Sequence, residues 1–143
     1  MDDTTKESIE FILNFLLMGD CGMKYVGPGQ KFEYGGDWFG GNPILIPQLN
    51  EIKSEFEKRD CDQAVLFNKI DEFKKMWPSV EFDWKNFQIQ LETRLRHRST
   101  PYYCSNADIK HVRSKYIETI MRFLPDQYES EIVSIVKSAF QAA

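Results

Sequence analysis

Two histidines, one cysteine and one aspartate form the group of side chains in this sequence with the character of metal ligands: His97, Cys104, Asp108 and His111. Asp108 and His111 would share one face of a helix at a spacing of three residues. The set lacks the closely spaced ligand pairs that zinc sites use. Cys104 with a histidine base also lacks a nearby glycine that could help to form an oxyanion hole. We therefore expect no metal, no cofactor and no enzymatic activity.

The glycines do not form a phosphate-binding loop. Gly27 and Gly29 have the spacing that begins a dinucleotide fingerprint, but the third glycine is missing and no helix is predicted directly after them. Some pair of carboxylates always exists among 22 acidic residues, and solvated helix faces account for such pairs. The sequence thus contains no motif that names a reaction.

Basic residues concentrate on both sides of Tyr102 and Tyr103, within the stretch 94–115. They are Arg94, Arg96, His97, Arg98, Lys110, His111, Arg113 and Lys115. Phosphate contacts combined with base stacking on the tyrosines would suit RNA or DNA. The competing explanation is structural. Cations near a helix C-terminus interact favourably with the helix dipole, and Glu118 could pair with Arg122. A nucleic-acid-binding regulator is therefore an alternative to the function that we predict below.

All eight glycines lie between Gly19 and Gly41, in a segment that is also rich in aromatic residues. Irregular segments on regular scaffolds often carry binding sites, and exposed aromatic rings with charged neighbours are typical anchors of protein interfaces. The candidate partner-binding residues here are Glu33, Tyr34, Asp37, Trp38 and Phe39. The alternative is that Trp38 and Phe39 fold back and fill the core.

An acidic run follows the glycine segment and extends the candidate surface. Its candidate partner-binding members are Glu51, Glu55, Asp60 and Asp62. The chain as a whole carries a net charge of -4, but residues 1–83 hold 16 acids and 9 bases whereas residues 84–143 hold 6 acids and 9 bases. The first part could therefore meet a basic partner, although a solvated helix face would show the same pattern.

Length and composition predict one domain over residues 1–143, since 143 residues with 42% apolar content can bury a core. Three widely spaced cysteines indicate free thiols in a reducing compartment. The acidic N-terminus does not resemble a signal peptide, and the apolar run at residues 11–18 is too short to span a bilayer. We expect a cytoplasmic protein with no membrane contact.

Hydrophobic spacing predicts a mainly α fold: a single compact helical domain of about six helices, with a small β-hairpin or irregular Gly/aromatic loop after the first helix. Thr4 is the expected N-cap of the first helix, and Asp60 or Asp62 that of the third. Asp126 and Glu129 have the spacing of a capping box for the last helix.

Residues 80–98 fit either a strand or a helix. The segment 87–96 alternates apolar and polar residues, as a half-buried strand would. Trp84, Phe87, Leu91 and Leu95 also mark one helical face, from which only Ile89 departs. We predict a helix, because the segment has few β-branched residues.

In size, acidity and lack of catalytic motifs the chain is similar to the small immunity proteins that bacteria make against nuclease toxins, although no shared motif supports the similarity. That resemblance implies a non-enzymatic module that neutralises a basic protein partner in a heteromeric complex by occluding its active face. Phage-encoded inhibitors of host defence share the same profile. A small enzyme without a visible motif is the remaining alternative; we expect no small-molecule substrate.

Overall fold

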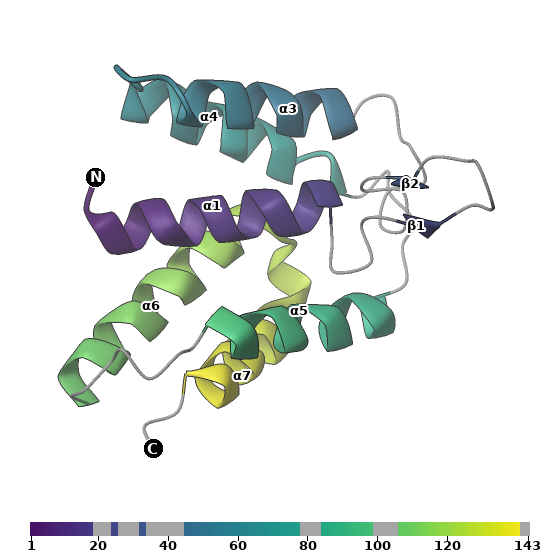
Figure 1. The fold of residues 1–143 in the computed structure, drawn as a ribbon, viewed down its shortest axis with the longest axis vertical. Helices are drawn as coiled ribbons and strands as arrows, with labels where there is room; N and C mark the ends of the chain where they lie inside the picture. The colour runs from purple at the N-terminus through teal and green to yellow at the C-terminus, as the bar shows by residue number, and fades with distance from the viewer. Residues whose placement is uncertain (19–23, 26–31, 34–44, 78–83, 99–105, 141–143) are drawn as a thin grey trace.

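The computed structural model describes residues 1–18, 24–25, 32–33, 45–77, 84–98 and 106–140. It confirms a mainly helical, compact fold with six α-helices in the described residues (Figure 1). The helices are α1 (Asp3–Met18), α3 (Leu45–Phe56), α4 (Gln63–Lys74), α5 (Trp84–Arg98), α6 (Asn106–Phe123) and α7 (Glu129–Ala139), with a 3-10 turn, η2 (Asp126–Tyr128), before α7.

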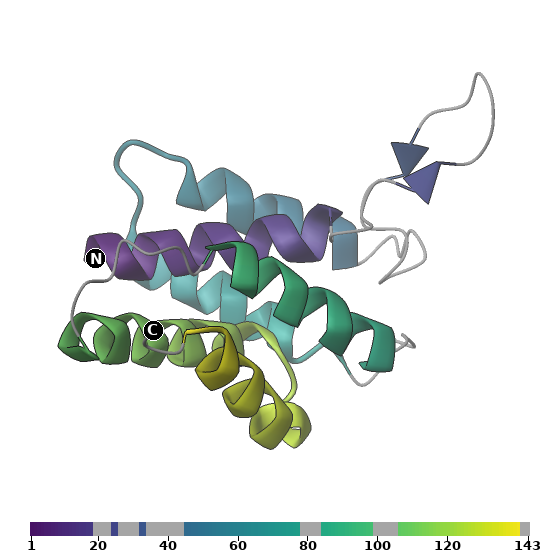
Figure 2. The same ribbon diagram turned by 60° about the horizontal axis from the view of Figure 1, so that its bottom comes forward.

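Two short strands, β1 (Lys24–Tyr25) and β2 (Phe32–Glu33), follow α1 and pair antiparallel. Lys24 lies opposite Glu33, and Tyr25 lies opposite Phe32. The strand pair lies beyond the C-terminal end of α1 and away from the helices (Figure 2). The two strands lie where the hairpin was expected, and the segment between them is outside the described residues.

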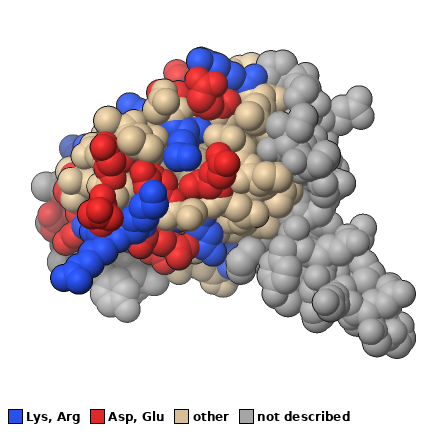
Figure 3. Space-filling view, turned by 90° about the horizontal axis from the view of Figure 1, so that it is seen from above, with Lys and Arg blue, Asp and Glu red and all other residues tan. Residues whose placement is uncertain are grey.

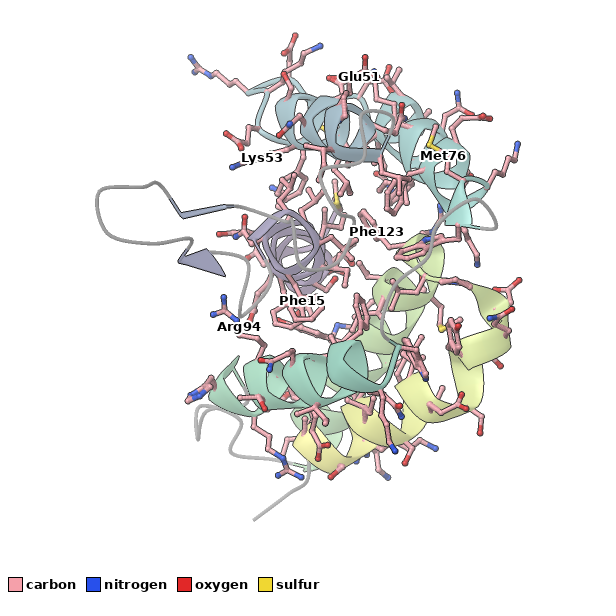
Figure 4. All side chains as sticks on the ribbon, turned by 90° about the vertical axis from the view of Figure 1, so that its right-hand side faces the viewer. Phe15, Glu51, Lys53, Met76, Arg94 and Phe123 are labelled. Atoms are coloured by element: carbon pink, nitrogen blue, oxygen red, sulfur yellow. The ribbon has the colours of Figure 1, made fainter. Side chains whose placement is uncertain are left out.

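Helix α1 is the centre of the fold because apolar residues occupy most of its circumference. It lies between the pair α3–α4 on one side and helices α5 and α6 on the other (Figure 1). Phe15 of α1 meets Phe87 of α5 edge to face, with ring centroids 5.1 Å apart. Phe123 of α6 packs near Phe73 of α4 at 6.2 Å, so aromatic side chains fill the space on both sides of α1 (Figure 4).

A buried chain of hydroxyl groups joins α1 to α6. Ser8 Oγ lies 2.8 Å from the Thr5 carbonyl oxygen and 2.7 Å from Thr119 Oγ1. A serine hydroxyl has one proton, so both contacts are satisfied when Thr119 donates to Ser8 and Ser8 donates to Thr5. Ser8 and Thr119 are both buried, so this contact is shielded from water.

The C-terminal end of α6 is capped by side chains from the region around the end of α4. The Met121 carbonyl would ordinarily accept from residue 125, but residue 125 is a proline and has no amide proton. Lys74 Nζ donates to this carbonyl at 2.8 Å. Trp77 Nε1 donates to the Phe123 carbonyl at 2.5 Å. Carbonyl groups that helix α6 leaves unpaired therefore find donors far away in sequence.

Two of the predicted helix starts are wrong and one is confirmed. Asp2, not Thr4, caps α1, because its carboxylate accepts the Thr5 amide at 2.7 Å; this bond lowers the pKa of Asp2. Asp62 caps α4 as predicted. Asp126 does not form the expected capping box, because its carboxylate pairs with Lys74 Nζ at 2.6 Å.

The ambiguous segment is helical, as predicted, over Trp84–Arg98. Phe87, Leu91 and Leu95 are fully buried, whereas Ile89 is 58% exposed. A strand would have placed Phe87, Ile89 and Leu91 on one face. The exposure of Ile89 follows directly from the helical period.

Candidate partner-binding surface

The glycine-rich part of the predicted surface lies mostly outside the described residues. Tyr34, Asp37, Trp38 and Phe39 are all outside them. The backbone of Glu33 belongs to β2. The roles of these five residues in binding remain predictions.

The predicted acidic residues of α3 and its following turn have different environments. Glu51 is exposed, points away from the bundle in Figure 4 and lies 3.9 Å from Lys69 Nζ. Glu55 is only 5% exposed, and its Oε2 lies 2.9 Å from Lys58 Nζ. This ion pair raises the pKa of Lys58. The expectation that Glu55 presents its carboxylate to a partner is corrected, since it has almost no accessible surface.

The remaining two acids flank the start of α4. Asp60 is exposed in the turn before the helix. Asp62 Oδ1 accepts hydrogen bonds from the amides of Ala64 and Val65 at 3.0 and 3.3 Å. One oxygen of its carboxylate is therefore engaged in capping α4. Asp60 is thus the more available of the two for contact with another molecule.

The outer face of α3 and α4 is a mixture of both charges. Residues 45–77 contain seven acids and six bases. Figure 3 shows red and blue side chains interspersed across this face. Its ion pairs include Lys53 with Glu57 at 3.7 Å and Lys75 with Glu72 at 3.2 Å. The expected acidic run is therefore nearly neutral on the surface, because lysines of the same two helices and their flanking turns pair with Glu51, Glu55, Glu57 and Glu72.

A groove of about 380 Å³ lies between α1 and α3. Its lining combines apolar with charged and polar side chains and consists of Glu10, Leu13, Asn14, Lys53, Phe56 and Glu57. Phe56 is also shared with a second hollow of about 340 Å³, which includes Met1, Lys6 and Asp60. The two hollows together follow the α1–α3 seam toward the turn that carries Asp60.

The structure does not bring the two parts of the predicted surface together. Glu33 lies beyond the C-terminal end of α1, whereas Asp60 lies near its N-terminal end (Figure 1). Helix α3, about 18 Å long, separates these ends. The α1–α3 groove occupies the intervening surface. The sequence contains a signal for it, because Glu10 and Asn14, four residues apart, interrupt the apolar run of residues 9–18.

The candidate metal ligands do not form a site among the described residues. His97 and His111 are exposed, and Cys104 lies outside those residues. Within the described ranges no group of three or more His, Cys, Asp or Glu side chains could hold a metal ion. Cys61 is partly buried, and burial raises the pKa of its thiol.

Among the described helices, none combines the length and the apolar character needed to cross a membrane. Comparison with protein-family models, curated proteins and solved structures gives no match to this chain. Function must therefore be argued from the surface itself.

Proposed function

We propose that this chain is a non-enzymatic protein-binding module that holds a basic segment of a protein partner in the α1–α3 groove. The observation that carries the proposal is the composition of this groove, in which buried Leu13 and half-buried Phe56 lie beside the exposed side chains of Glu10 and Glu57. An apolar anchor surrounded by charge is the usual arrangement of a specific interface.

The two groove carboxylates favour a cationic partner. No ion pair within the described residues includes Glu10, which is exposed. Glu57 lies 3.7 Å from Lys53 Nζ, but both side chains are about half exposed, and such pairs contribute little to stability. A lysine or arginine from a partner can therefore pair with Glu10 and compete with Lys53 for Glu57. The four acids and one base of residues 1–18 add to the attraction.

Occlusion is the mechanism that fits such a module. A partner that grips RNA or DNA has a basic active face, and covering that face would inhibit it without any chemistry by the inhibitor. This is the mode expected of an immunity protein acting on a nuclease toxin. Steering by opposite charges would make association fast at low salt and slower as salt rises.

The proposal is tested by charge reversal in the groove. The variant Glu10→Lys/Glu57→Lys is compared with Glu72→Lys/Glu118→Lys, which makes the same charge change at exposed positions outside the groove. Each tagged chain is used to capture proteins from its native lysate, and the captured protein is identified by mass spectrometry and assayed for nuclease activity. We expect a basic protein whose activity is inhibited by the chain, and at least about tenfold weaker binding for the groove variant alone.

Equal binding by both variants would overturn the groove as the binding site. Capture of only acidic proteins, or of a nuclease that remains active in the complex, would overturn the proposed function. Trp38→Ala adds the glycine segment to the same assay. Weaker binding at an unchanged melting temperature would assign Trp38 to the interface, whereas a sharply lowered melting temperature would assign it to the core.

A further inference from the structure

Cations from three helices meet around the last turn of α7. Lys137 belongs to this turn. Lys110 and Arg113 belong to α6 and line a common hollow with Lys137. Arg96 reaches it from α5, where its guanidinium donates to Ser138 Oγ at 2.8 Å. Three of the basic residues that flank the Tyr102–Tyr103 pair in the sequence therefore lie beside α7, which packs against both helices.

The hollow between α6 and α7 has the composition of an anion site. It measures about 280 Å³ and is lined by Lys110, Arg113, Ser114, Ile117 and Lys137. None of the described residues that line it is acidic, and within the described ranges no ion pair includes any of its three cations. On the outer face of α3 and α4, by contrast, most exposed lysines have a carboxylate beside them.

The shape of the site favours a chain of phosphates over a single small anion. Lys110 and Ile117 are seven residues apart on α6, which corresponds to about 10 Å. Arg96 lies beyond the hollow on the α5 side of α7, where its guanidinium is paired with Glu92 at 2.9 Å. Ser114 can donate a hydrogen bond to a phosphate oxygen, and half-buried Ile117 offers an apolar contact to a sugar or base.

A membrane surface fits this face less well. Interfacial binding requires large apolar side chains that enter the lipid beside the cations. The exposed large hydrophobic residues in the described part of the chain are Met1, Val65 and Ile89, none of which lies on α6 or α7. Phosphates presented by a polymer in solution match the face better.

We infer that the α6–α7 hollow binds the backbone of a single-stranded nucleic acid, with Lys110, Arg113 and Lys137 contacting phosphates and Ser114 adding a hydrogen bond. Arg96 is already paired with Glu92, so it lies at the edge of this site and not within it. Arg94 is two residues before Arg96, about 200° around α5, and is not part of the site. This site lies away from the α1–α3 groove (Figure 1). The proposal of a nucleic-acid site is therefore independent of the proposed protein partner.

The experiment measures binding of fluorescein-labelled single-stranded 20-nucleotide RNA and DNA of mixed sequence by fluorescence anisotropy, from low to moderate salt. The triple variant Lys110→Gln/Arg113→Gln/Lys137→Gln is compared with the matched control Arg59→Gln/Lys69→Gln/Lys75→Gln, which removes the same charge from the region of α3 and α4. We expect the first variant to bind at least about tenfold more weakly than the native chain. The slope of log K against log salt should fall by about 2, since each phosphate contact to a single strand contributes about 0.7.

The control should bind like the native chain. Equal weakening in both triple variants would mean that net charge alone drives binding, and would overturn the site. No binding of either oligonucleotide at low salt would also overturn it, as would binding to vesicles of anionic phospholipid but not to the oligonucleotides. Circular dichroism establishes that each variant is folded; should the triple variant be unfolded, Arg113→Gln alone is tested, with about threefold weakening expected and unchanged binding refuting the site.

Discussion

The hydroxyl contact between Ser8 and Thr119 leads to an asymmetric prediction for the stability of the fold. Ser8→Ala removes the acceptor of the Thr119 proton. Because Thr119 is only 5% exposed, its hydroxyl cannot donate to water instead. Thr119→Val removes that donor but leaves Ser8 its bond to the Thr5 carbonyl. The serine substitution should therefore cost more free energy of unfolding than the threonine substitution does.

The magnitudes follow from the cost of a buried unpaired donor. Stranding one such group costs about 1–3 kcal/mol, whereas replacing both partners by apolar groups is close to neutral. We expect about 2 kcal/mol for Ser8→Ala, under about 1 kcal/mol for Thr119→Val, and about 1 kcal/mol for the double variant. The double-mutant cycle then gives a coupling energy of about 1–2 kcal/mol.

Urea denaturation of the four proteins at pH 7, followed by far-UV circular dichroism, measures these differences. The m-values should stay equal, because the substitutions do not change the surface exposed on unfolding. For a chain of this length, 2 kcal/mol corresponds to a melting temperature lowered by about 7 °C. Strictly additive single costs, or a larger loss for Thr119→Val than for Ser8→Ala, would refute the inferred direction of the hydrogen bonds.

Two further predictions concern other hydrogen bonds of the fold. Trp77→Phe removes the donor to the Phe123 carbonyl and part of a buried ring, and should lower the free energy of unfolding by about 2–4 kcal/mol in urea denaturation; native stability would contradict this. Because the bond to the helix amide lowers the pKa of Asp2 in the folded chain, its stabilisation is fully present above the ordinary aspartate pKa and is lost as pH falls through the lowered value. Native chain and Asp2→Asn should therefore differ most in melting temperature near pH 7 and progressively less below about pH 4, and a difference that is constant with pH would refute this assignment.

Local periodicity was sufficient to predict most of the helices. Phe87, Leu91 and Leu95 are buried on one face of α5 and Ile89 is exposed, as helical spacing requires. Asp62 also acts as the predicted cap, because an N-cap depends on neighbouring amides alone. These features depend on contacts within a few residues.

The incorrect predictions involve contacts between distant segments. Arg122 was expected to pair with Glu118, but its guanidinium lies 3.6 Å from Asp71 and 4.3 Å from the ring centre of Phe67. Local spacing could not indicate that α4 would supply both partners. Glu55 is a different case, since it continues the core spacing of Leu45, Leu49 and Ile52 along α3. That spacing alone predicts a buried position for Glu55, whereas its negative charge predicts an exposed one.

The candidate site was harder to predict than the fold. A groove forms along the line where two helices pack together. The residues that line it depend on which helices become neighbours. Glu10 and Glu57 are 47 positions apart in the sequence and share a groove only because α1 packs beside α3. The same holds for Lys110 and Lys137, which belong to one hollow because η2 turns α7 back along α6.

The capping of α6 by Lys74 and Trp77 has a consequence for how the chain unfolds. Those two donors belong to the acidic first part of the sequence, and the carbonyls that they satisfy belong to the basic second part. Separating the parts would leave carbonyls of α6 without these donors. Pro125 has no amide proton to offer them, and the chain has no glycine after Gly41 that could form a C-terminal cap. We therefore expect that the contrast in charge does not mark a division between folding units. Neither fragment should hold its native structure alone, and the intact chain should lose its structure in one cooperative transition.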